Sequence, residues 1–200
     1  LILSPHIGDL NSIQAVEYFE RTINTFKNFY DFEPEVVICD KHPNYESTKF
    51  AFKLKEKNPN IKLIQIQHHY SHILSVMAEN KLDEEVLGIA FDGTGFGDDG
   101  NIWGGEVFVA SRKEYKRVNH IKYFRLLGGE MAIKEPKRVA LSLLFDVFSL
   151  EEILLLDIPT VKAFKEAEIK MLYTMWQKGL NAPLTSSVGR LFDAISSFAN

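Results

Sequence analysis

The order of apolar and amphipathic segments in the first third of the chain constrains the fold more than any other feature. The run EVVICD, residues 35–40, has the length and β-branched content of a buried strand. An amphipathic segment follows at 47–58, with Ser47 as its expected N-cap. A second strand pattern, 62–67, precedes a second helical pattern at 71–80. Strands that alternate with helices usually pair in parallel, so this part predicts an α/β unit with a parallel sheet.

The pattern changes after residue 84. Three strand-like stretches, 85–93, 101–111 and 117–127, are separated by short connections, which favours an antiparallel meander and hence a new sheet. Beyond them the sequence reads as helical, in the segments 135–148, 149–156, 160–179 and 187–200. We therefore predict two domains, 1–84 and 85–200, with the boundary in the charged stretch near 82–86.

Composition and charge exclude several classes of protein. A net charge of −4 and a pI near 5.9, with no basic run, argue against a nucleic-acid partner. The single cysteine, Cys39, provides neither a disulfide framework nor a Cys-rich zinc site, which suits a reducing, cytoplasmic compartment. With no apolar run of membrane-spanning length and no signal peptide, we expect no membrane association. The chain begins at Leu1, inside an apolar segment, and we expect it to be a piece of a longer protein.

Three histidines lie within five positions in HHYSH, directly after the second strand pattern. On a helix, His68 and His72 would lie one turn apart on the same face, with a spacing that suits two ligands of one metal ion. His69 would point elsewhere. The alternative is that these histidines cap the helix or form hydrogen bonds in the core, and the motif alone leaves both interpretations open. A metalloprotease motif of the H-E-x-x-H kind requires a glutamate where this sequence has His69.

The segment DGTGFGDDGN, residues 92–101, is rich in glycine and aspartate. Its glycines would let backbone N–H groups approach a phosphate, and Asp92 could bind a cation or position a water molecule. An ordinary hairpin loop is the alternative. A calcium loop is disfavoured because the spacing lacks the alternation of an EF-hand and its closing glutamate.

A third candidate segment, SSVGRLFDA, surrounds the expected start of the last helix. Ser187, Gly189, Arg190 and Asp193 could meet a ribose or a phosphate there. A plain serine N-cap with a solvated arginine explains the same residues.

Together these motifs resemble those of the HypF family of hydrogenase maturation carbamoyltransferases. IQHHYSH is similar to the family motif V-x-H-H-x-A-H, with Ile66 for valine and Ser71 for alanine. The aspartate-glycine segment and the SSVGRLFDA segment occur in the family's order and approximate spacing. The resemblance covers nearly the whole chain. It implies an α/β fold of the two-domain actin, Hsp70 and sugar-kinase type (Kae1-like), truncated at both ends, with a nucleotide and metal cleft.

The resemblance also implies a reaction. In this family, carbamoyl phosphate and ATP yield carbamoyl adenylate on another domain, and the Kae1-like domain transfers the carbamoyl group to a C-terminal cysteine of HypE. This supplies the cyanide ligands of [NiFe] hydrogenase. Because the domains that make the adenylate are absent, we expect the chain alone to be catalytically incomplete.

The resemblance assigns roles to individual residues. It implies that His68, His72 and Asp92 are catalytic and bind zinc or iron, with magnesium as a further candidate ion. The ATP or AMP contacts implied by the same motifs are Asp92, Gly93, Thr94, Gly95, Gly97, Ser187, Gly189, Arg190 and Asp193.

Two other functions are compatible with parts of this pattern. A threonylcarbamoyl transferase or a sugar-kinase-like relative would use the same fold, although HHYSH lacks the acidic residue of the tRNA-modifying group and a kinase needs no paired histidines. A binding module without chemistry, in which the histidines are structural, is the third possibility.

Overall fold

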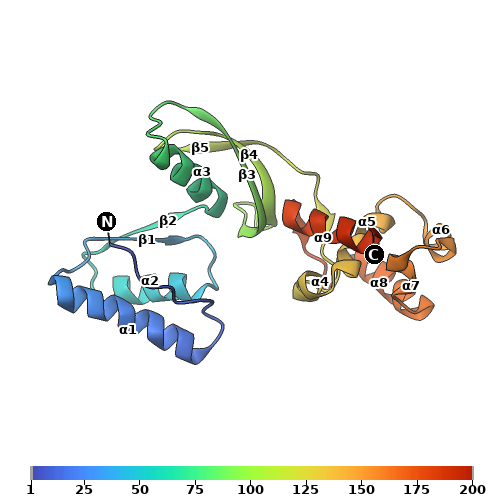
Figure 1. Ribbon diagram of the computed structural model, residues 1–200, viewed down its shortest axis with the longest axis horizontal. Coiled ribbons are helices and arrows are strands. Elements are labelled where there is room, and N and C mark those ends of the chain that lie inside the picture. Colours follow the sequence, from blue (N-terminus) through green and yellow to red (C-terminus); the bar gives the residue numbers. More distant parts are fainter. Residues whose placement is uncertain (1, 200) are drawn as a thin grey trace. The chain divides into compact units, whose positions relative to one another are not determined.

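The computed structural model describes residues 2–199 (Figure 1). The chain divides into two compact units, one up to Gln67 and one from His68 onward. The domain boundary near 82–86 stays a prediction. The compact units divide earlier, because the helix that follows the second strand packs on the next strand of the second unit. No helix within residues 2–199 combines the length and apolar character that a bilayer span requires.

The first unit contains the predicted parallel strand pair. Strand β1 (Val36–Asp40) pairs in parallel with β2 (Lys62–Ile66), and helix α2 (Glu46–Lys57) connects them, as the sequence predicts. Ser47 is not the N-cap. The helix begins one residue before it and Tyr45 takes the extended N-cap conformation, so the serine lies in the first turn.

Helix α1 (Ile13–Tyr30) precedes these elements and was not predicted. Its signals are nevertheless in the sequence: Ser12 caps the helix by accepting a hydrogen bond from Ala15 N at 3.2 Å, and Asp31 ends it in the left-handed conformation.

The second unit opens with helix α3 (His68–Glu79), which leads into the antiparallel meander of β3 (Val86–Phe96), β4 (Ile102–Ala110) and β5 (Tyr115–His120). The meander is confirmed. β3 extends further than predicted and contains much of the segment expected to be a loop. Its register with β4 is interrupted between Phe91 and Gly95.

β3 forms one edge of the sheet within the described chain. The strand order is β3-β4-β7-β6, with β5 also paired to β4, so β4 is the neighbour of β3 among residues 2–199. Leu87, Ile89 and Phe91 alternate along β3 and are 60–68% exposed. These three residues form what we call the exposed β3 face.

The predicted third strand is in fact two elements. β5 ends at His120, and β6 (Phe124–Arg125) pairs instead with β7 (Leu184–Thr185), a strand that the helical reading of this region missed. β7 also lies parallel to β4, with Thr185 opposite Ile102. This pairing brings the start of the last helix to the middle of the sheet.

The remaining elements are helices packed around an apolar core. They are α4 (Glu130–Lys134), α5 (Pro136–Phe145), α6 (Leu150–Leu155), α7 (Pro159–Lys162), α8 (Glu166–Lys178) and α9 (Val188–Ala199). Pro136 is at the first turn of α5 and Gly179 ends α8 at φ 65°, both as predicted. The segment 160–179, predicted as one helix, is split into α7 and α8, because the intervening Phe164 turns into the core.

Candidate metal centre

Helix α3 places two histidines on one face. It begins at His68, three residues earlier than the helical pattern indicated, so His68 and His72 lie one turn apart. Their Nε2 atoms are 3.3 Å from each other. This confirms the predicted alignment of the two imidazoles.

Asp92 of β3 completes the cluster. Its Oδ2 atom lies 3.0 Å from Nε2 of His68 and 3.7 Å from Nε2 of His72. These three residues offer ligand atoms that all lie within 4.8 Å of one another. The two histidines on the helix and the aspartate on the strand, which follows them by at least 20 positions, therefore converge on one point.

The donor set and its spacing fit a transition-metal ion. Imidazole nitrogen and carboxylate oxygen are ligands for zinc and for iron(II), and three protein ligands leave a position for a substrate or water. Tetrahedral ligands at zinc distances would be about 3.3 Å apart, close to the separations found here. Within residues 2–199, Oδ2 of Asp92 is a buried oxygen that accepts no hydrogen bond of good geometry. A bound cation would satisfy it.

His69 contributes to the same site, which the sequence did not predict. Its side chain is fully buried, and its Nε2 lies 3.7 Å from Oδ2 of Asp92, so the expectation that it points elsewhere is wrong. Burial lowers the pKa of His69 to about 4; the neighbouring His68 adds to the decrease, and the carboxylate of Asp92 partly opposes it. His69 is therefore neutral at physiological pH and forms the floor of the cluster.

Gly95 makes room for that floor. A Cβ at this position would lie 2.3 Å from Cε1 of His69 and 3.0 Å from Cδ2 of His68, closer than real side chains approach. Gly97 does the same for Trp103, whose Nε1 would lie 2.2 Å from an added Cβ. Gly95 and Gly97 thus allow large side chains to pack closely against the backbone of this segment. The phosphate-loop interpretation did not predict this role.

Two contacts hold α3 against the sheet. Ile73 packs directly on Gly88, where an added Cβ would lie 2.5 Å from the isoleucine Cδ1. At the start of the helix, the Tyr70 hydroxyl donates a hydrogen bond to the carbonyl of Ser111 at 2.7 Å. Together these contacts fix the position of the histidine-bearing turn relative to the sheet.

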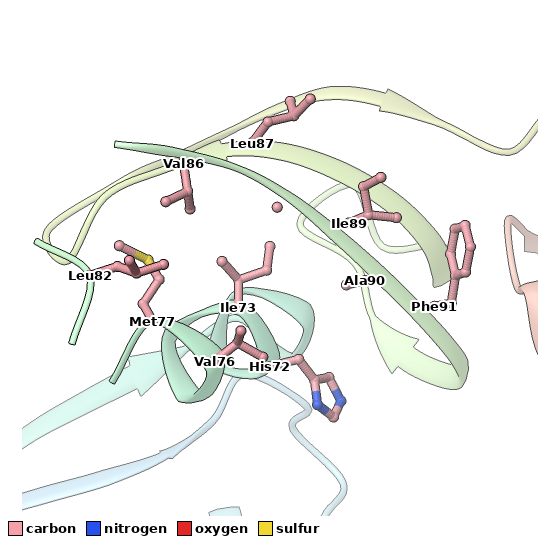
Figure 2. Close-up of a pocket in the computed structure, with 11 residues that line it drawn as sticks. His72, Ile73, Val76, Met77, Leu82, Val86, Leu87, Ile89, Ala90 and Phe91 are labelled. Atoms are coloured by element: carbon pink, nitrogen blue, oxygen red, sulfur yellow. The ribbon is translucent and has the colours of Figure 1, made fainter. Parts of the chain in front are cut away.

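An apolar groove of about 350 Å³ runs between α3 and β3 and ends at His72 (Figure 2). Its walls include Val76, Met77, Leu82 and Val86. The groove brings apolar surface up to one of the candidate ligands, while the other two lie outside its lining.

The SSVGRLFDA segment contacts the same end of β3. The Ser187 hydroxyl lies 3.0 Å from the carbonyl oxygen of Asp92 and 2.8 Å from that of Gly93. Ser187 also accepts a hydrogen bond from Arg190 N at 3.1 Å, which confirms the N-cap interpretation. The arginine is not solvated: its side chain is 16% exposed and lies 2.7 Å from Oδ2 of Asp193.

The loop residues predicted to contact a nucleotide are therefore close to the candidate metal ligands. Gly189 approaches Gly93 so closely that an added Cβ would lie 2.9 Å from its Cα, and Arg190 lies 3.3 Å from where a Cβ of Gly93 would be. The Gly93 N–H donates to Oδ1 of Asp92 at 2.6 Å, and the Thr94 hydroxyl donates to the Gly93 carbonyl at 2.5 Å. Nucleotide contacts by these residues stay a prediction.

The tip of the β3–β4 hairpin carries a second carboxylate that is strongly held. Asp99 accepts hydrogen bonds from Trp103 Nε1 at 2.8 Å, from the Tyr123 hydroxyl at 2.5 Å and from the backbone N–H of Asn101 at 3.0 Å. Burial alone would raise the pKa of Asp99, but these hydrogen bonds lower it from 3.8 to about 2. This network shapes the hairpin and was not predicted.

Comparison with known proteins identifies the family. The HypF Kae1-like domain model matches residues 1–79, and the second subdomain of the carbamoyltransferase Kae1-like domain matches residues 88–200. The chain belongs to the HypF family. A carbamoyltransferase HypF from Synechocystis sp. is 42% identical over 97% of this chain, and a probable carbamoyltransferase HypF from Methanocaldococcus jannaschii is 34% identical over 97%.

Solved HypF structures share the fold. Full-length HypF in its phosphate- and nucleotide-bound form superposes with a TM-score of 0.84 at 39% identity, covering 96% of this chain and 24% of that one. HypF from T. kodakarensis gives 0.82 at 36% identity, covering 96% and 26%. The predicted Kae1-like α/β fold class is thereby confirmed. The chain spans about a quarter of the length of the relatives it matches.

Proposed function

We propose that this chain is the part of a HypF-type carbamoyltransferase that carries out carbamoyl transfer, with His68, His72 and Asp92 holding a zinc or iron ion. The observation that carries the proposal is the convergence of these three ligand atoms within 4.8 Å. Membership of the HypF family supports the reaction class. The nucleotide-bound state of a HypF relative supports a nucleotide as the leaving part of the donor.

The proposed reaction uses carbamoyl adenylate, made elsewhere in the complete protein from carbamoyl phosphate and ATP. The thiolate of a C-terminal cysteine of HypE attacks the carbamoyl carbon, a C–S bond forms, the C–O bond to phosphate breaks, and AMP leaves with the electron pair. A bound zinc or iron ion would act as a Lewis acid that stabilises negative charge developing on the reacting group.

The residues of the chain bind and orient the reactants. His68 and His72 would hold the ion through imidazole nitrogens, and the Asp92 carboxylate would reduce the net charge of the bound ion. His69 fills the space beneath them, which limits the access of water to a labile adenylate. Because hydrolysis would compete with transfer, this exclusion has a direct chemical benefit.

The nucleotide would bind beside the metal ligands. Gly93, Thr94 and Gly95 lie on the strand that carries Asp92, and Gly97 follows directly after it. The N-terminus of α9 with Arg190 adds positive potential suited to a phosphate. The remaining proposed contacts are Ser187, Gly189 and Asp193. Magnesium bound to the nucleotide would add a further ion.

The proposal is tested by alanine substitution of the ligands in the complete protein. His68→Ala and Asp92→Ala should each abolish carbamoylation of HypE and remove the bound metal while the circular dichroism spectrum stays unchanged. His120→Ala and the exposed Asp83→Ala make the same changes outside the cluster and should retain activity. Activity retained in both ligand variants would contradict the proposal.

A further inference from the structure

Glu106 is a charged residue buried in the middle of the sheet. Its side chain is completely inaccessible, yet four donors reach it: Arg117 Nε at 2.6 Å, the backbone N–H groups of Gly104 and Gly105 at 3.1 and 3.2 Å, and the Ser186 hydroxyl. An ion pair this fully satisfied fixes the geometry of the groups around it. Glu106 therefore anchors the segment between β7 and α9 to β4.

The next residue along that segment reaches the candidate metal ligand. Ser187 is also fully buried, and its hydroxyl lies within hydrogen-bonding distance of the carbonyl oxygens of Asp92 and Gly93. These two carbonyls lie where the register between β3 and β4 is interrupted, between Phe91 and Gly95. The serine hydroxyl thus supplies a donor at a point where the regular strand ladder is broken.

The backbone around this contact is closely packed. A Cβ on Gly104 would lie 2.5 Å from the carbonyl oxygen of Asp92 and 2.9 Å from Cα of Ser187. The backbone of Asp92 is therefore confined between β4 on one side and the start of α9 on the other.

We propose that Ser187 is a positioning residue for the metal ligand: it holds the backbone of Asp92 and Gly93 so that the Asp92 carboxylate stays directed at the histidines, with Glu106 fixing Ser186 beside it. The inference rests on the metal centre of the proposed function. It assigns Ser187 a role in metal binding, beyond the nucleotide contact of the proposed function.

The test measures metal binding directly, without turnover. In the complete protein, stripped of metal, Co²⁺ affinity and the visible Co²⁺ spectrum are recorded for wild type, Ser187→Ala and the milder Ser187→Cys. The His68→Ala/His72→Ala double variant supplies the background from any other sites. Removing a group that orients a metal ligand typically lowers affinity 10- to 100-fold, and we expect a loss of about that size in Ser187→Ala, a smaller loss in Ser187→Cys and an altered spectrum in both.

Ser142→Ala is the matched control. Ser142 is fully buried in α5 of the same unit, and within residues 2–199 its hydroxyl has no hydrogen-bond partner. Ser142→Ala also removes a buried hydroxyl, but it should leave Co²⁺ affinity and the Co²⁺ spectrum unchanged. Thermal unfolding of the metal-free proteins separates a general loss of stability from a loss of ligand orientation.

The outcomes are distinct. Wild-type Co²⁺ affinity and spectrum in both Ser187 variants would overturn the positioning role, whether or not these variants bind ATP more weakly. If Ser187→Ala fails to fold, the cysteine variant decides. If wild type shows no binding above the double-variant background, the metal centre itself fails, and with it the proposed function.

Discussion

Gly95 limits what the histidine floor of the site can tolerate. Gly95 does not have a positive φ, so a side chain is excluded there by steric overlap and not by backbone strain. An added methyl group would lie 2.3 Å from Cε1 of His69. No flexible side-chain end is available to move, because both His69 and the helix that carries it are packed against the sheet.

We therefore expect Gly95→Ala to lower stability by about 1–3 kcal/mol through overpacking and to weaken metal binding as well. Calorimetric metal titration and thermal unfolding provide the two measurements. Gly93→Ala is the contrasting variant, since a methyl group there meets Arg190 at 3.3 Å, and its effect on metal affinity should be much smaller. Equal metal affinities in wild type and Gly95→Ala would argue against the His69 floor.

Asp99 gives the chain a defined acid response. Its pKa is lowered in the folded state to about 2 from 3.8, so its stabilising contribution is complete above pH 3.8 and is lost as the pH falls towards 2. The side chain is 38% exposed, so after allowance for solvent screening we expect about 1 kcal/mol. Asp99→Asn should reduce the unfolding free energy at pH 7 and converge with wild type near pH 2. Asp83, whose side chain is 75% exposed, provides the control: Asp83→Asn should leave the unfolding free energy unchanged at pH 7 and at pH 2. An effect of Asp99→Asn that does not vary with pH would refute this account.

At the scale of elements, the contact of α3 with β3 determines where the histidines lie. An alanine methyl group at position 88 would lie 2.5 Å from Cδ1 of Ile73. Gly88→Ala should therefore destabilise the fold by about 1–3 kcal/mol. Ile73→Ala should cost less in the Gly88→Ala background than in wild type, because the new methyl group occupies part of the space. A double-mutant cycle in urea measures this coupling, and additive effects would contradict direct packing.

The elements also show how far local sequence patterns reach. The strands β1, β2 and β4, the helix start at Pro136 and the N-cap Ser187 were predictable, because each depends on nearby periodicity or on a cap. β7 was not, since its two residues become a strand only by lying between β4 and β6. The split between α7 and α8 likewise depends on Phe164 finding a place in the core.

The candidate site divides along the same line. The spacing of His68 and His72 on a helix indicates shared ligation of one metal ion. The approach of Asp92 to these histidines was predicted only from the family resemblance. Nothing local in the sequence indicates that His69 would turn towards Asp92, because that depends on the gap left by Gly95. The Ser187 hydroxyl was predicted to bind a nucleotide, and its contact with the Asp92 carbonyl depends on tertiary packing.

At the scale of the whole molecule, all three candidate ligands belong to the unit that begins at His68. Metal at about 100 times its dissociation constant would stabilise the folded state by about 2.7 kcal/mol. We expect hydrogen exchange to slow in α3 and β3 on adding Zn²⁺, while amides of β1 and β2 keep their rates. The His68→Ala/His72→Ala variant should show no change; equal slowing throughout the chain would mean that protection is not local to the site.

The exposed β3 face has a practical consequence for anyone who prepares residues 1–200 alone. β3 is an eleven-residue strand with one edge unpaired within residues 2–199 and with three large apolar side chains in alternation. Such a strand is a template for pairing with another chain. Such a preparation should self-associate as its concentration rises, and the sedimentation coefficient should increase accordingly. Ile89→Lys, which places a charge at the centre of that row, should delay the onset of aggregation and extend the concentration range usable for solution measurements.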